Sequence, residues 1–101
     1  LDATLDRAQS TAVFRVFQEL LTNVARHSAA SRVQVVFDRS DDCYVLSVSD
    51  DGKGITREDV DDPASLGIIG MRERLRPLHG TIEFRQRRPR GTTVRVTVPA
   101  W

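Results

Sequence analysis

Apolar and polar residues alternate along four short stretches of this sequence, and this alternation restricts the fold more than any other feature. Because successive side chains of a strand point to opposite faces, each stretch is expected to form a strand with one apolar and one polar face. Such strands are typical of antiparallel sheets packed on one side only. Helices must then cover the apolar face, so the sequence predicts an α+β, two-layer sandwich. The stretches are 32–38, 44–49, 81–87 and 92–98.

Helical periodicity predicts a first helix that ends near His27 and begins at one of two places. Asp6, with Gln9 three residues later, forms a capping-box pattern that would start the helix at Arg7. Ser10 is the rival cap and would start it at Thr11.

A second helix is expected over residues 67–79, with Met71, Leu75 and Leu78 facing inward. Pro77 is expected to distort its last turn because proline lacks a backbone N–H. Gly80 is the expected C-terminal cap.

The composition excludes several classes of protein. The chain has 101 residues, enough for one domain (1–101), and a net charge of +1 gives no electrostatic case for nucleic acid. It contains one cysteine, Cys43, which cannot form an internal disulfide. No apolar run reaches the length of a membrane span, and no signal peptide is visible. Because the sequence starts at Leu1, we expect a piece of a longer protein.

The first helix carries a stripe of polar residues beside its apolar face. Glu19, Asn23 and His27 are four residues apart, and residues at this spacing are neighbours on a helix. A carboxylate and an amide oxygen are hard donors that suit Mg²⁺, which also carries nucleotide phosphates. The alternative is a solvated outer face, which most amphipathic helices have.

Glycine-containing motifs follow at three further places. Residues 50–54 (Asp-Asp-Gly-Lys-Gly) end a strand, and the carboxylate of Asp50 could accept a hydrogen bond from an exocyclic amine such as that of adenine. Residues 67–70 (Gly-Ile-Ile-Gly) open the second helix, whose first N–H groups suit phosphate. Residues 91–93 (Gly-Thr-Thr) begin the last strand. A plain turn, a hinge and a β edge are the respective alternatives.

The order of these motifs resembles the GHKL ATPase superfamily, over residues 10–99. The helix with Glu-x-x-x-Asn, the Asp-x-Gly-x-Gly loop, the Gly-x-x-Gly helix start and the Gly-Thr strand look like its N, G1 and G2 boxes and its final motif. Residues 14–27 and 70–75, with the short segment between Gly54 and Gly67, are similar to sensor histidine kinases of the nitrate-sensor type. The resemblance implies the Bergerat ATP-binding fold, with a mixed, mostly antiparallel sheet.

The resemblance also implies a role for each residue. Glu19 would be the general base or orient a water on Mg²⁺, Asn23 would bind Mg²⁺, and Asp50 would accept the adenine amine. Thr92 or Thr93 would reach the adenine side. The remaining nucleotide contacts would come from Arg26, His27, Gly52, Gly54, Ile55, Gly67, Ile68, Gly70 and Met71. The implied cofactors are ATP and Mg²⁺.

The function implied is transfer of the γ-phosphoryl group of ATP to a histidine on a separate dimerisation domain. The implied partners are that domain and a response regulator. The parent would be a homodimer that could be anchored in a membrane, and this fragment would be a monomeric cytoplasmic domain. Rival functions are an anti-sigma-factor-type serine kinase and a non-enzymatic nucleotide-binding domain. Sequence upstream of Leu1 would distinguish the two kinases.

Three further expectations concern the parts outside these motifs. The strand expected before the first helix is absent or reduced to residues 1–4, and residues 56–66 are expected to be mobile without nucleotide. The run of arginines at 85, 87, 88 and 90 is expected to be a solvated turn. His79 is expected to serve the C-terminus of the second helix.

Overall fold

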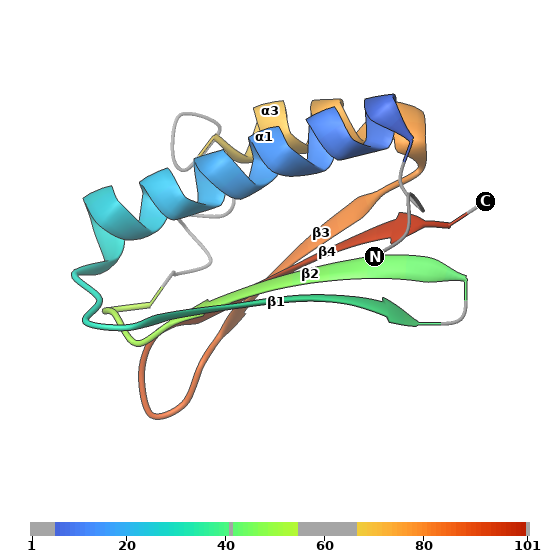
Figure 1. Ribbon diagram of the computed structural model, residues 1–101. Helices are drawn as coiled ribbons and strands as arrows, with labels where there is room; N and C mark the ends of the chain where they lie inside the picture. The colour runs from blue at the N-terminus through green and yellow to red at the C-terminus, as the bar shows by residue number, and fades with distance from the viewer. Residues whose placement is uncertain (1–5, 41, 55–66, 101) are drawn as a thin grey trace.

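The computed structural model describes residues 6–40, 42–54 and 67–100. Two helices lie on one face of a four-stranded sheet with the order β1-β2-β4-β3, which confirms the two-layer α+β sandwich (Figure 1). All the strand pairs in these ranges are antiparallel. The sequence analysis expected a mixed, mostly antiparallel sheet, and the described part of the sheet contains no parallel pair. Residues 1–4, the expected site of a reduced first strand, lie outside the description. The elements are α1 (Arg7–Asn23), β1 (Val33–Ser40), β2 (Cys43–Asp50), α3 (Ile68–Leu75), β3 (Thr81–Gln86) and β4 (Thr92–Pro99).

Helix α1 begins at Arg7 because Asp6 caps it. The Asp6 Oδ1 accepts a hydrogen bond from the backbone N–H of Gln9 at 2.7 Å, and the Gln9 Oε1 accepts one from the backbone N–H of Asp6 at 3.0 Å. This reciprocal pair is the predicted capping box. The Gln9 side chain also donates to the backbone oxygen of Pro99 at 3.2 Å, which fixes the start of α1 over the end of β4.

The end of α1 differs from the expectation. The α-helix stops at Asn23, and residues Val24–Ser28 continue as a π-helical turn, η1. In a π-helix, neighbours along the axis are five residues apart, so the four-residue stripe predicted to run on to His27 ends at Asn23. The side chain of His27 lies outside the described part of the chain. No helix in the described ranges is long and apolar enough to cross a membrane.

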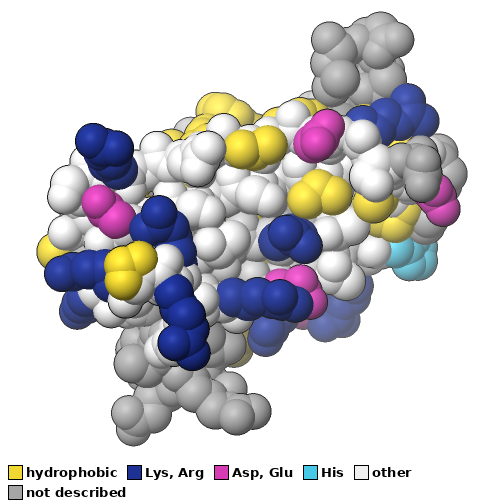
Figure 2. Space-filling model, turned by 90° about the horizontal axis from the view of Figure 1, so that it is seen from below, with side chains coloured by type: hydrophobic (Ala, Val, Ile, Leu, Met, Phe, Trp, Pro, Cys, Tyr) yellow, Lys and Arg dark blue, Asp and Glu magenta, His cyan; other side chains and the backbone are white. Residues whose placement is uncertain are grey.

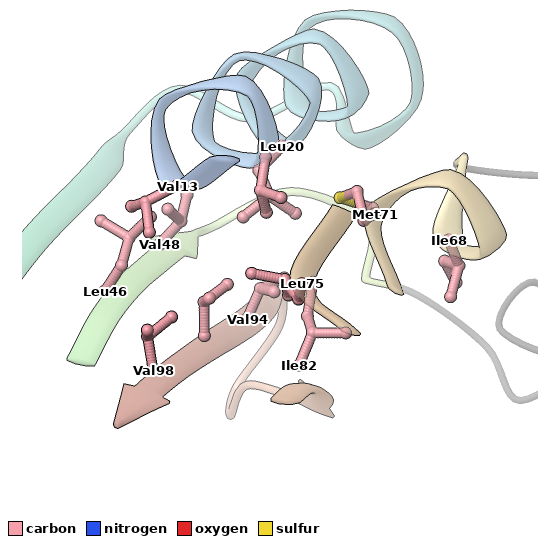
Figure 3. Close-up of a cluster of buried hydrophobic side chains, with 12 residues drawn as sticks. Val13, Leu20, Leu46, Val48, Ile68, Met71, Leu75, Ile82, Val94 and Val98 are labelled. Atoms are coloured by element: carbon pink, nitrogen blue, oxygen red, sulfur yellow. The ribbon is translucent and has the colours of Figure 1, made fainter. Parts of the chain in front are cut away.

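The core lies between the helices and the covered face of the sheet (Figure 3). Every second residue of β2 and β4 points into it, as the alternation predicts, and α1 and α3 contribute their apolar sides. Burying aliphatic side chains in this way is the main force that holds the two layers together. The cluster consists of Val13, Val16, Leu20, Leu46, Val48, Ile68, Met71, Leu75, Ile82, Val94, Val96 and Val98.

Strand β1 is the exception to the predicted burial. Val33, Val35 and Phe37 pair with buried or core positions of β2 and face the helix side, yet each is 40% to 43% exposed. The expectation that helices cover the whole apolar face is therefore wrong for this edge strand. Alternation reports which residues share a face, but it does not report how far the covering helix reaches. The ring of Phe37 stacks on that of Tyr44, with 6.1 Å between centroids.

The last turn of the second helix is distorted at Pro77, as predicted, but the left-handed cap is not the predicted residue. The α-helix stops at Leu75 and a 3-10 turn, η2 (Arg76–Leu78), follows with Pro77 in its first turn. The left-handed residue after it is His79, with φ of 56°, and not Gly80. Position 80 is crowded for another reason: an added Cβ would lie 3.2 Å from the Leu75 side chain and from the Thr97 backbone oxygen, so a larger residue would need a small shift of these neighbours.

Candidate functional site

The first and third motifs meet where α3 begins. Gly67 caps α3 in the left-handed conformation, with φ of 65°, and a Cβ added to it would lie 2.8 Å from the Glu19 Oε2. The Glu19 carboxylate therefore packs against the backbone of Gly67, 48 positions further along the chain. A hollow of about 290 Å³ opens beside this contact, lined by Arg15, Gln18, Glu19, Thr22, Gly67, Gly70, Met71 and Arg74.

The second motif presents a buried carboxylate. Asp50 is the last residue of β2, lies on the covered side of the sheet and is 5% exposed. Its Oδ1 accepts a hydrogen bond from the backbone N–H of Gly52 at 2.8 Å. Within the described residues its other oxygen, Oδ2, accepts none. A buried polar atom without a protein partner calls for an explanation, and a ligand that donates a hydrogen bond is one.

The turn before β4 packs directly on the Asp50 loop. Gly91 has φ of 113°, and an added Cβ would lie 1.9 Å from the backbone oxygen of Asp50. Gly54 has φ of 87°, and its added Cβ would lie 3.1 Å from the backbone oxygen of Gly91. The two loops are therefore in backbone contact, which explains why both motifs contain glycine.

The register of β2 and β4 separates the two threonines of the last motif. Thr92 pairs with Asp50, is 7% exposed and lies on the same covered side. Thr93 lies on the opposite, open face, where its hydroxyl is 3.0 Å from that of Ser49. Of the two alternatives left by the sequence, Thr92 therefore shares the face of Asp50, and Thr93 as an adenine contact is not supported.

Asp51 has a structural role that the sequence analysis missed: its side chain binds backbone N–H groups of a distant segment. Its Oδ1 accepts hydrogen bonds from the backbone N–H groups of Ser31 at 2.8 Å and Arg32 at 2.9 Å. These bonds tie the loop to the segment that follows η1, so the end of the first motif and the second motif are held together. The Arg32 N–H, followed by that of Ser31 and by the Arg87 charge, holds the pKa of the Asp51 carboxyl below its ordinary value, against an opposing effect of burial.

We expect the Asp51→Asn variant to be less stable than the parent at pH 7 and to approach it in acid. A carboxyl whose folded pKa is depressed stabilises the fold above its unfolded pKa and loses this contribution as the pH falls through the folded value. The stability difference should therefore shrink below about pH 4. Urea unfolding at pH 7, 5 and 3 measures it, with Asp42→Asn on an exposed turn as control. A difference that stays the same at all three values would contradict the assignment.

The remaining predicted residues fall into distinct groups. The side chains of Ile68 and Met71 are 2% and 1% exposed and belong to the core, so only their backbone is available to a ligand. Gly52 is buried, whereas Gly70 is exposed on α3 and a Cβ added to it would meet nothing within 4 Å. Arg26 is exposed on η1. Ile55 and the segment 56–66 that was expected to be mobile lie outside the described residues.

The donor set for a metal ion is small. Among the described residues, no three His, Cys, Asp or Glu side chains come together as a metal-binding group. Glu19 and Asn23 lie four residues apart on the same helix and are both half-buried. One carboxylate and one amide oxygen fit Mg²⁺, which usually takes few protein ligands and completes its shell with water and substrate phosphates.

The chain matches the family model described as "Histidine kinase-, DNA gyrase B-, and HSP90-like ATPase" over residues 8–101. It belongs to this ATPase family. The sequence is 35% identical to the sensor histidine kinase LiaS of Bacillus subtilis over 98 residues, which is 97% of this chain and 27% of LiaS. It is 34% identical to the oxygen sensor histidine kinase NreB of Staphylococcus carnosus over 94 residues, which is 93% of this chain and 27% of NreB.

A solved structure agrees with this assignment. The histidine kinase domain of the blue-light activated histidine kinase from Erythrobacter litoralis superimposes with a TM-score of 0.76 and 26% identity, over 92% of this chain and 48% of that one. The superfamily predicted from the order of the motifs is thus confirmed. This ATPase-family chain spans about a quarter of the length of the curated relatives LiaS and NreB.

Proposed function

We propose that this domain binds ATP with its adenine against Asp50. The observation that carries the proposal is the buried carboxylate, whose Oδ1 is held by the Gly52 N–H while Oδ2 has no partner in the described residues. A hydrogen bond from the exocyclic amine of adenine would satisfy that oxygen. Thr92 lies beside it on the same face of the sheet, and the Gly54 backbone contacts Gly91 at the rim.

The phosphates would extend from the adenine site at Asp50 toward the start of α3. The first N–H groups of a helix and its positive dipole end favour phosphate, and the exposed Gly70 leaves the backbone accessible there. Arg26 and His27 on η1 would contact the phosphate side. Mg²⁺ would be held by Asn23 and Glu19, and it would neutralise charge on the phosphates when bound.

We propose that the parent protein transfers the γ-phosphoryl group to a histidine on a separate dimerisation domain. The histidine nitrogen attacks the γ-phosphorus, the bond to the β-phosphate oxygen breaks, and ADP leaves. Glu19 would accept the proton from the nucleophile or orient a water on the metal. The phosphoryl group would pass on to a response regulator. Sensor histidine kinases among the relatives support this assignment over a serine kinase or a non-enzymatic nucleotide-binding domain.

The proposed setting follows from the same assignment. The domain would work in the cytoplasm as part of a homodimeric parent that could be anchored in a membrane, and the 101-residue fragment would be a monomer. Nucleic acid is not among the proposed partners.

Titration calorimetry of the domain with ATP, with and without Mg²⁺, tests the proposal. We expect micromolar to millimolar affinity, roughly −4 to −8 kcal/mol, tighter with Mg²⁺ and weaker for GTP, which lacks the adenine amine. The Asn23→Ala variant should lose the gain from Mg²⁺ and keep metal-free binding, because the amide oxygen is a hard donor. Gln34→Ala removes the same group from the open face and is the matched control. Absence of nucleotide binding at millimolar concentration would refute the proposal, and equal loss with and without Mg²⁺ would refute the metal role.

A further inference from the structure

The arginine-rich turn between β3 and β4 is exposed, yet one of its side chains bonds to the loop that follows β2. Lys and Arg side chains gather on the open face of the sheet at the end that carries this turn (Figure 2). Arg90, on this turn, donates a hydrogen bond from Nε to the backbone oxygen of Gly52 at 2.9 Å. The sequence predicts a solvated turn at 85–90, and residues 85–90 are indeed exposed, but the Arg90 contact was not foreseen.

The Arg90 contact reaches the carboxylate of Asp50 through a single residue. Gly52 accepts from Arg90 with its carbonyl oxygen and donates with its own N–H to the Asp50 Oδ1 at 2.8 Å. The bond from Gly52 to Asp50 is buried, and the bond that Gly52 accepts from Arg90 is part-buried. A hydrogen bond from a guanidinium is charge-assisted and stronger than one between neutral groups.

The turn that carries Arg90 is itself held in place. Arg87 donates its backbone N–H to the oxygen of Gly91 at 2.9 Å, and its Nη1 lies 3.3 Å from the oxygen of Arg90. Gly91 in turn packs on the backbone of Asp50. Arg90 therefore projects from a fixed base toward Gly52, so its contact is not that of a loose surface side chain.

We propose that Arg90 is a positioning residue for the adenine-binding carboxylate: through Gly52 it fixes the side chain of Asp50 so that Oδ2 faces the base. The inference rests on the proposed ATP site. It concerns the base end of the nucleotide only, because the contact of Arg90 is with the loop and not with the phosphate end. Loss of Arg90 should therefore weaken every adenine ligand by the same factor, whatever its phosphate content.

The test compares Arg90→Gln with Arg88→Gln in the 101-residue domain. Arg88 carries the same charge on the same turn and has no hydrogen bond or ion pair among the described residues. Calorimetry with Mg-ATP and with adenosine should show about tenfold weaker binding of both to Arg90→Gln, the size expected for one charge-assisted hydrogen bond. Binding of Mg-tripolyphosphate, which has no base, should not change. Arg88→Gln should bind all three like the parent.

Amide hydrogen exchange of the nucleotide-free domain gives a second reading that does not depend on nucleotide binding. The Gly52 N–H, which bonds to Asp50, should exchange faster in Arg90→Gln than in Arg88→Gln. If the Gly52 N–H exchanges at the same rate in both variants, the inference about Arg90 is wrong, whether or not the parent domain binds ATP. If the parent domain binds no ATP, the proposed function is wrong, and this result is independent of the exchange rate. Suppose that the parent domain binds ATP. Arg90 then does not position the base if Arg90→Gln binds adenosine with the affinity of the parent domain, or if the substitution weakens only the binding of tripolyphosphate.

Discussion

Replacing Gly91 with alanine is expected to destabilise the domain by about 3 kcal/mol or more. An added Cβ would lie 1.9 Å from the backbone oxygen of Asp50, far inside any tolerated contact, and φ of 113° is a conformation that side-chain-bearing residues rarely adopt. The atom it meets belongs to the backbone, so no side chain can rotate away. Either β4 or the Asp50 loop must shift, and both carry the proposed site.

Thermal unfolding measures this effect. For a domain of this size, each kcal/mol lowers Tm by about 4 to 8 °C, so a fall of at least about 12 °C is expected. Gly70→Ala is the matched control, because its added Cβ meets nothing within 4 Å in the helix α3. That variant should be as stable as the parent or up to about 1 kcal/mol more stable. Equal Tm values for Gly91→Ala and the parent would show that the two loops do not pack as described.

The elements that the sequence predicted best are those with strong local signals. The strand expected at 44–49 is observed at Cys43–Asp50, and that expected at 92–98 is observed at Thr92–Pro99. Alternation marks such strands because one face must be buried. The Asp6–Gln9 capping box also depends on neighbours in the sequence, and its prediction was confirmed.

Features that depend on distant contacts could not be predicted in the same way. The exposure of β1 depends on where α1 lies over the sheet, and the sequence of β1 contains no information on that position. The choice between Thr92 and Thr93 required the register of β2 against β4. The contact of Arg90 with Gly52 joins residues 38 positions apart, so an arginine run on a turn was given its usual solvated interpretation.

The site was predictable as an order of motifs but not as a geometry. Glu19 and Gly67 were assigned to one site by resemblance, and the structure brings them into contact. Asp51 and Arg90 were missed because each bonds to a backbone group far away in the sequence, and such a contact leaves no local pattern of residue types. A useful signal was nonetheless present: both residues directly adjoin the motif positions Asp50 and Gly91.

The largest effect on activity is expected from Glu19→Gln in the parent protein. If Glu19 is the general base of phosphoryl transfer, its amide should lower the rate of histidine phosphorylation by about 100-fold or more. ATP should remain bound, because the proposed adenine contacts at Asp50 are unchanged. Glu83→Gln removes a carboxylate of the same kind from an exposed position of β3, and this variant should be phosphorylated on histidine at the rate of the parent.

The 101-residue domain alone should not phosphorylate itself. His27 lies on η1, within the proposed nucleotide-binding region, and His79 follows η2 at the far end of α3 from Gly67. Phosphoryl transfer requires the nucleophile in line with the bond that breaks, and a misaligned group loses most of the rate. We therefore assign the acceptor histidine to another domain of the parent.

Incubation with ATP labelled in the γ-phosphate tests this account most directly, with acid-labile, base-stable label on histidine as the signal. The account predicts label in the parent protein, loss of that label in Glu19→Gln, and none in the isolated domain. Histidine label in the isolated domain, or an unchanged rate in the Glu19→Gln parent that still binds ATP, would contradict it.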